Sequence, residues 1–155
     1  MMQPTDKQKR FAAVSVLACC IAVPAEGLRQ WAYHDPVGIL TTCYGHTGEV
    51  EKGRKYSLDE CKALLTADML EAVEAVENCH PNLPINVHAA FADAVFNIGP
   101  KVACESTASR LLDAGNYEGA CRELPRWNRS RVAGVLVPLP GLTKRRNAEM
   151  LLCLS

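Results

Sequence analysis

The chain has 155 residues, of which 48% are hydrophobic, and its 17 basic and 17 acidic side chains balance. This size predicts a single domain, or two lobes around a hinge, with enough apolar surface to form a core. The balanced charge argues against a nucleic-acid-binding protein, for which a basic excess is typical, although the stretch from Arg122 to Glu149 is locally basic and suits contact with a polyanion.

The N-terminal segment has the order of an export signal. Three basic residues, Lys7, Lys9 and Arg10, precede an apolar run from Phe11 to Ala25, as in the basic and apolar regions of such signals. Because a stable membrane span needs roughly 20 strongly apolar residues, this short, alanine-rich run is expected to hold weakly in a bilayer. We therefore predict that residues 1–25 are an export signal or signal anchor, followed by a domain formed by residues 26–155.

The fate of this segment stays open among four alternatives. The residues Val23-Pro24-Ala25 fit a signal-peptidase site, and Cys19 ends a stretch loosely similar to a lipoprotein acylation site. Alternatively, the segment is an uncleaved anchor that later leaves the membrane, or a buried N-terminal helix of a cytosolic protein. Cleavage after Ala25 is unattractive because it would leave Glu26 at a free N-terminus, with no helical turn before it.

The next elements are predicted to be a small sheet and a long helix. A short helix that begins inside the apolar run should end between Glu26 and Arg29. From about residue 33 to 56, Asp35-Pro36 and several glycines interrupt short β-prone runs, which predicts an antiparallel sheet with tight turns. Ser57 and Glu60 form a capping box, and apolar residues recur at helical spacing to about residue 78. At ~1.5 Å per residue, this helix is roughly 30 Å long and can join two lobes.

The remaining chain, about residues 82–155, is predicted to form a helical lobe. Its expected elements are a helix ended by Gly99-Pro100, helices from about Ser106 to Ala114 and from Tyr117 to Leu124, a Pro/Gly loop from Leu136 to Gly141, and a final helix from Leu142 or Thr143. The predicted fold class is therefore α+β, with a small antiparallel sheet lobe and a helical lobe joined by a long helix.

Three side chains around the start of the sheet suggest carbohydrate chemistry. Glu26 ends a helix, Asp35 opens the sheet, and Thr41 lies on the following strand. Hydrolysis of a glycosidic bond needs one protonated carboxyl group and a second group that handles the nucleophile. A chain that turns from a helix into a hairpin can place such groups around one cleft. The spacing alone permits this site without establishing it, because a chain with many carboxylates offers many such pairs.

This segment resembles the phage T4-type lysozymes of glycoside hydrolase family 24. Their pattern of Glu, eight residues, Asp, five residues and Thr falls on Glu26, Asp35 and Thr41. Further matching segments are Gly45-His46-Thr47-Gly48, Phe96-Asn97-Ile98-Gly99, Arg126-Trp127 and the stretch from Gly141 to Glu149. The similarity extends along nearly the whole chain after Ala25, and the nearest subgroup is the lambdoid endolysins with a signal-anchor-release N-terminus. One family glycine is replaced here by Cys43.

The resemblance implies a lysozyme fold and hydrolysis of the β-1,4 bond between N-acetylmuramic acid and N-acetylglucosamine in peptidoglycan, for host cell lysis. It implies that no cofactor is needed. The balanced charge argues against nucleic acid and the cysteine spacing against a metal, and we expect a monomer. The expected path is export, tethering to the inner membrane through residues 11–25, and release into the periplasm. Two rivals remain: a lytic transglycosylase acting on the same substrate and a non-catalytic wall-binding protein of the same fold.

The resemblance also implies roles for individual residues. Glu26 is expected to be the general acid, Asp35 to activate or position the attacking water, and Thr41 to hold that water, with inversion at the anomeric carbon. Their plainer alternatives are an ion-paired glutamate, an Asp-Pro turn and a β-prone threonine. Supporting roles are expected for Arg145 as a partner of Glu26, for Asn97 in glycan binding and for His46, although a structural role suits His46 better. Core packing is the better interpretation of Trp31 and Trp127.

The eight cysteines favour an oxidising compartment with some disulfides. No Cys-x-x-Cys pair is present, so we expect no metal site. Cys121 and Cys153 recur in the resembling endolysins, which makes them the first pair to consider. Cys43 has two candidate partners, Cys61 or a cysteine of the anchor, and the second would allow disulfide exchange to switch the enzyme.

Overall fold

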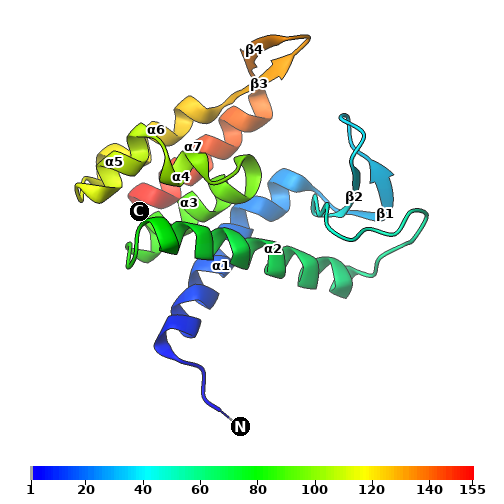
Figure 1. Cartoon of the computed structure of the whole chain (residues 1–155), viewed down its shortest axis with the longest axis horizontal. Helices are drawn as coiled ribbons and strands as arrows, with labels where there is room; N and C mark the ends of the chain where they lie inside the picture. Colours follow the sequence, from blue (N-terminus) through cyan, green and yellow to red (C-terminus); the bar gives the residue numbers. More distant parts are fainter. Residues whose placement is uncertain (1) are drawn as a thin grey trace.

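The computed structural model describes residues 2–155 and has a small sheet lobe and a larger helical lobe (Figure 1). This arrangement confirms the predicted α+β class. The helices are α1 (Asp6–Glu26), α2 (Leu58–Cys79), α3 (Ile85–Ile98), α4 (Lys101–Cys104), α5 (Thr107–Asp113), α6 (Tyr117–Glu123), the 3-10 helix η1 (Leu124–Trp127) and α7 (Pro140–Leu154). The strands are β1 (Arg29–His34), β2 (Leu40–Cys43), β3 (Arg129–Val132) and β4 (Val135–Pro138).

Helix α1 is longer than the sequence analysis predicted. A short helix beginning inside the apolar run is wrong, because Thr5 and Gln8 form a capping box that starts the helix at Asp6. One stripe of α1, which includes Phe11, Val14 and Ala18, is buried, and the helix packs against α3. Among residues 2–155, α1 is also the one helix whose length and apolar composition would permit a membrane span. Glu26 is its last residue, so the segment predicted as a leader positions the first candidate catalytic residue.

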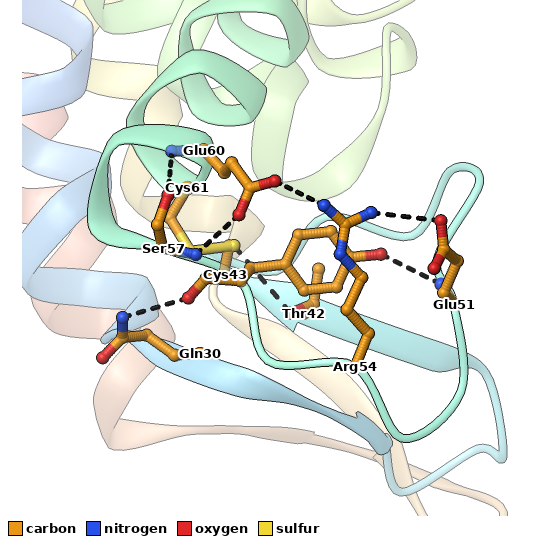
Figure 2. A network of polar contacts seen from close by, with 9 residues as sticks. Gln30, Thr42, Cys43, Glu51, Arg54, Ser57, Glu60 and Cys61 are labelled. Atoms are coloured by element: carbon orange, nitrogen blue, oxygen red, sulfur yellow. Dashed lines mark hydrogen bonds and ion pairs between the residues drawn. A yellow bond between two sulfur atoms is a disulfide. The ribbon is translucent and has the colours of Figure 1, made fainter.

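The sheet lobe consists of the antiparallel pair β1–β2, and polar contacts fix it to the start of α2 (Figure 2). The Ser57 hydroxyl accepts from the backbone N–H of Glu60, and the Glu60 carboxylate accepts from the backbone N–H of Ser57. This is the predicted capping box. Arg54 donates to the carboxylates of both Glu51 and Glu60. The loop before α2 is thereby tied to the first turn of the helix.

A disulfide between Cys43 and Cys61 joins the end of β2 to the same turn of α2 (Figure 2). The backbone of Cys43 has φ 57°, a left-handed conformation that glycine adopts freely and that costs an L-residue roughly 1–2 kcal/mol. This backbone conformation therefore explains why the family pattern has glycine at this position. In this chain, the disulfide and burial hold a side chain in the same backbone shape.

We predict that glycine is the better residue at position 43 once the disulfide is removed. The double variant Cys43→Gly/Cys61→Ala should be more stable than Cys43→Ala/Cys61→Ala by about 0.5–1 kcal/mol. Only alanine must adopt the left-handed backbone with a Cβ, and the greater freedom of glycine in the unfolded chain offsets part of that cost. Urea unfolding of the two variants measures this difference. Equal stability, or a more stable alanine variant, would show that the local backbone relaxes when the disulfide is absent.

The helical lobe is built around α3, which is buried along most of its length and packs against α1, α2 and α7. Two disulfides lie in this lobe, Cys121–Cys153 between α6 and α7 and Cys79–Cys104 between α2 and α4. The second pair was not foreseen from the sequence. Cys19 and Cys20 of α1 are free thiols.

The segment before α7 differs from the prediction. The expected loop from Leu136 to Gly141 is wrong, because residues 129–138 form the antiparallel hairpin β3–β4, and α7 begins earlier than expected, at Pro140. The turn residues Ala133 and Gly134 have φ 50° and 81°. Two positive φ angles define the tight hairpin turn whose twist matches that of the strands. Because the first turn position is alanine rather than the usual asparagine, aspartate or glycine, this hairpin was not recognised from the sequence.

Candidate active site

Glu26 lies in a cleft between the sheet lobe and the helical lobe. The cleft has a volume of about 630 Å³ and is lined by Glu26, Gly45, His46, Thr47, Gly48, Asp68, Glu71, Ala72, Ala75, Val95, Phe96, Asn97 and Pro100. The Glu26 side chain is 23% exposed, so the carboxyl group is shielded but reachable from the cleft. Gly45 approaches it closely: a Cβ at this position would lie 3.2 Å from Glu26 Oε2, and the backbone there has φ +78°. Only glycine meets both requirements without a shift of the carboxyl group.

Arg145 of α7 is hydrogen bonded to the Glu26 carboxyl group. Its Nη1 donates to Glu26 Oε1 over 2.5 Å, while its Nε and Nη2 both donate to Asp93 of α3 over 2.9 Å. Burial alone would lower the pKa of Arg145, but the hydrogen bonds and charges of Asp93 and Glu26 outweigh it and raise the pKa above its ordinary value. Arg145 is therefore a permanent cation shared between two carboxyl groups.

The neighbouring Arg146 is fully buried and reaches a second cleft residue. Its Nη2 donates to Asn97 Oδ1 over 2.9 Å and to Glu149 Oε1 over 2.5 Å. Burial, followed by interaction with Asp93, raises the pKa of Glu149 to about 9, although the charge of Arg146 opposes the shift. Glu149 is consequently protonated near neutral pH.

His46 lines the same cleft, in the loop after β2. Its Nδ1 is 2.7 Å from Asp68 Oδ2, an ion pair when the imidazole is protonated, and both residues line the cleft. This contact joins the loop after β2 to the middle of α2. His46 thus has a structural partner and a position facing the cleft at the same time.

Asp35 and Thr41 occupy the β1–β2 hairpin and are not among the residues that line this cleft. Asp35 Oδ1 accepts from the backbone N–H groups of Val37 and Ile39, over 3.0 and 2.8 Å, which is the hydrogen bonding of a turn aspartate. The Thr41 hydroxyl donates to the Ile39 carbonyl, and the residue is 3% exposed. Glu26, His46 and Asn97 therefore line one cleft, and Arg145 is hydrogen bonded to Glu26. Asp35 and Thr41 are not part of this lining and lie in the hairpin.

The expectation that Trp31 packs in the core is wrong, since this residue is 60% exposed. It lies on β1 between Gln30 and Ala32, and the outward positions of a two-stranded sheet with one covered face point to solvent. Trp127 does pack against the core, at the end of η1.

The sequence analysis missed Asp68 and Asp93. Asp93 carried a readable signal: it is a lone charge among the alanines of α3, one turn before Asn97 on the same helix face. A carboxylate on such an apolar stripe needs a cationic partner. Asp68 had no comparable signal, because acidic residues are common on the exposed faces of helices such as α2.

Comparison with known proteins decides the family. Residues 24–149 match the family model described as phage lysozyme. The chain belongs to the phage lysozyme family. A SAR-endolysin of Bacteriophage PS119 is 34% identical, over 99% of this chain and 96% of the relative. An endolysin of Acyrthosiphon pisum secondary endosymbiont phage 1 is 38% identical, over 80% of this chain and 86% of the relative.

A solved structure agrees with these sequence relatives. The endolysin from Escherichia coli O157:H7 phage FAHEc1 superposes with a TM-score of 0.76 at 29% identity, over 99% of this chain and 94% of that one. Family membership makes the chain a lysozyme-type glycoside hydrolase, an endolysin that degrades the cell wall in host lysis. The cleft around Glu26 is therefore the cleft of a phage lysozyme.

Proposed function

We propose that this phage lysozyme hydrolyses the β-1,4 bond between N-acetylmuramic acid and N-acetylglucosamine, with Glu26 as the general acid. The observation that carries the proposal is the half-shielded Glu26 carboxyl group, which faces an open inter-lobe cleft and is held by Arg145. Asn97 and His46 supply hydrogen-bonding groups on the cleft walls for the sugar hydroxyl and amide groups.

The attacking water is assigned to Asp35 and Thr41. The spacing of these residues from Glu26 supports the assignment, and the Asp35 carboxylate keeps one oxygen available: within residues 2–155, Oδ2 accepts no hydrogen bond, whereas Oδ1 serves the turn. Attack by a water from the face opposite the protonated leaving oxygen inverts the anomeric carbon. A movement of the β1–β2 hairpin toward bound glycan would bring Oδ2 to that water.

Export, membrane tethering through residues 11–25 and release into the periplasm complete the proposed function. The relative named SAR-endolysin and the apolar composition of α1 support this path. In the structure, α1 is packed against α3 and ends at Glu26. Docking of this helix therefore builds one wall of the cleft, which links release of the segment to formation of the site.

The products of peptidoglycan digestion test the reaction class. Hydrolysis in water enriched in oxygen-18 should give new reducing ends that carry one heavy oxygen, visible by mass spectrometry, and the first-formed anomer should be α by NMR. Products ending in an anhydro-sugar would show a lytic transglycosylase instead. Tight binding to peptidoglycan without any product would show a wall-binding protein.

We predict that Asp35→Asn lowers the turnover number about 10²-fold or more, since the amide cannot accept a proton from the attacking water. The side-chain oxygen of the introduced asparagine still accepts the backbone N–H groups of Val37 and Ile39, so the hairpin and the melting temperature should be preserved. Initial rates on solubilised glycan strands, with thermal unfolding as the fold control, measure both quantities. Wild-type turnover in this variant would restrict Asp35 to its role in the turn.

A further inference from the structure

The hairpin β3–β4 stands at the end of the helical lobe, on the opposite side of the molecule from the N-terminus (Figure 1). Its strands pair Arg131 with Leu136 and Val132 with Val135. Since side chains alternate between the faces of a strand, the pairing separates two faces. One carries Ser130, Val132, Val135 and Val137, and the other carries Arg129, Arg131, Leu136 and Pro138.

Aliphatic side chains at the tip of this hairpin are open to solvent. Val132 is 50% exposed, Val135 is 61% exposed and Leu136 is 52% exposed. The apolar surface continues at the base of the hairpin in a hollow of about 730 Å³, whose lining includes Pro138, Leu139, Ala148 and Leu151. Single exposed aliphatic residues are common on protein surfaces, whereas a continuous cluster such as this one marks an interaction surface.

The charges around the tip are all positive. No acidic residue occurs between Arg126 and Glu149, and Glu149 is buried and protonated. Arg126 pairs with Glu123 over 3.4 Å, whereas Arg129, Arg131 and Lys144 form no ion pair within residues 2–155. A chain with no net charge therefore presents a cationic and aliphatic projection at this end.

We propose that the β3–β4 hairpin docks on an anionic phospholipid surface. Charge complementarity selects this partner: unpaired arginines bind lipid phosphates, while the valines and Leu136 enter the boundary between headgroups and acyl chains. The hairpin has no aromatic side chain, which disfavours stacking on sugar rings as its purpose. The contact is separate from the start of α1, which lies at the end of the molecule opposite the hairpin (Figure 1).

Sedimentation of the full chain with lipid vesicles tests the docking. The vesicles consist of phosphatidylcholine alone or of phosphatidylcholine with phosphatidylglycerol. The variants are Arg129→Gln/Arg131→Gln and Val132→Ser/Val135→Ser, and the charge-matched control is Lys52→Gln/Lys55→Gln in the sheet lobe. All of them retain α1, so its contribution to vesicle binding is common to the series.

We expect the wild type to bind the phosphatidylglycerol vesicles preferentially, and each hairpin variant to bind them about tenfold or more weakly. The lysine control should bind like the wild type, and all proteins should digest soluble glycan fragments at the same rate. Unchanged vesicle binding in both hairpin variants would overturn the proposal. Weaker binding of these variants to purified peptidoglycan, with vesicle binding intact, would overturn it as well and make the hairpin a wall contact.

Discussion

Replacing Glu26 by Gln should lower peptidoglycan hydrolysis by about 10³-fold, near the middle of the range for loss of a general acid. Glutamine has the size of glutamate, and its carbonyl oxygen can still accept from Arg145 Nη1, so the substitution removes the proton and little else. The leaving oxygen of the glycan would then depart without protonation. Clearance of purified peptidoglycan, followed by turbidity, measures the loss.

A matched control is Glu74→Gln, which neutralises an exposed carboxylate of α2 that does not line the cleft. This variant should clear peptidoglycan like the wild type. Glu26→Gln should still sediment with peptidoglycan, because the cleft keeps Asn97 and His46 as binding groups. Clearance above a tenth of the wild-type rate would remove Glu26 from the role of general acid, while loss of sedimentation would indicate a distorted cleft.

The elements that sequence analysis predicted well were those encoded by local chemistry. The capping box at Ser57 and Glu60 fixes the start of α2, and the apolar spacing beyond it fixes the length of the helix. The position of Glu26 at a helix end also followed from the chain order. These features depend on residues a few positions apart, so a single sequence contains the information.

What escaped prediction depends on contacts between distant residues. The partnership of Arg145 with Asp93 spans 52 residues and was not expected. The partnership of Arg145 with Glu26 spans 119 residues; it was expected from the family resemblance, not from any local pattern, and is confirmed. No pattern of neighbouring residues predicts that one arginine pairs with these two carboxyl groups. The direction of Asp35 is a related case, because an Asp-Pro turn satisfies the carboxylate locally, and only the path of the whole hairpin determines whether its second oxygen can reach a bound glycan.

Asp93 is the site of a second large expected effect, because its carboxylate holds Arg145, the partner of Glu26. Nε and Nη2 of Arg145 both donate to Asp93, which fixes the direction in which Nη1 reaches Glu26. In Asp93→Asn, the amide offers one oxygen and one N–H group where the carboxylate offers two oxygens, so one of the two hydrogen bonds is lost. Arg145 and the Glu26 carboxyl group should then be misplaced, and kcat/KM for solubilised glycan should fall by about 10²-fold.

Stability falls in the same variant, since one charged partner of a buried pair is gone. We expect a loss of about 1–3 kcal/mol in the free energy of unfolding. The substitution also acts on Glu149 of α7, whose Oε1 lies 3.9 Å from Arg145 Nε, because Asp93 helps to raise the pKa of that carboxyl group. The pKa of Glu149 should therefore be lower in Asp93→Asn, so the variant changes more than one charge beside Arg145.

Binding and turnover separate this positioning role from a general loss of structure. A merely loosened cleft would raise KM and leave kcat nearly unchanged, and this outcome would contradict the proposed role of Asp93. Asp59→Asn is the charge-matched control, because it neutralises an exposed aspartate in the first turn of α2. This control should digest glycan like the wild type. A loss of kcat confined to Asp93→Asn, in enzyme that remains folded, would mean that a residue without contact to the glycan positions Glu26.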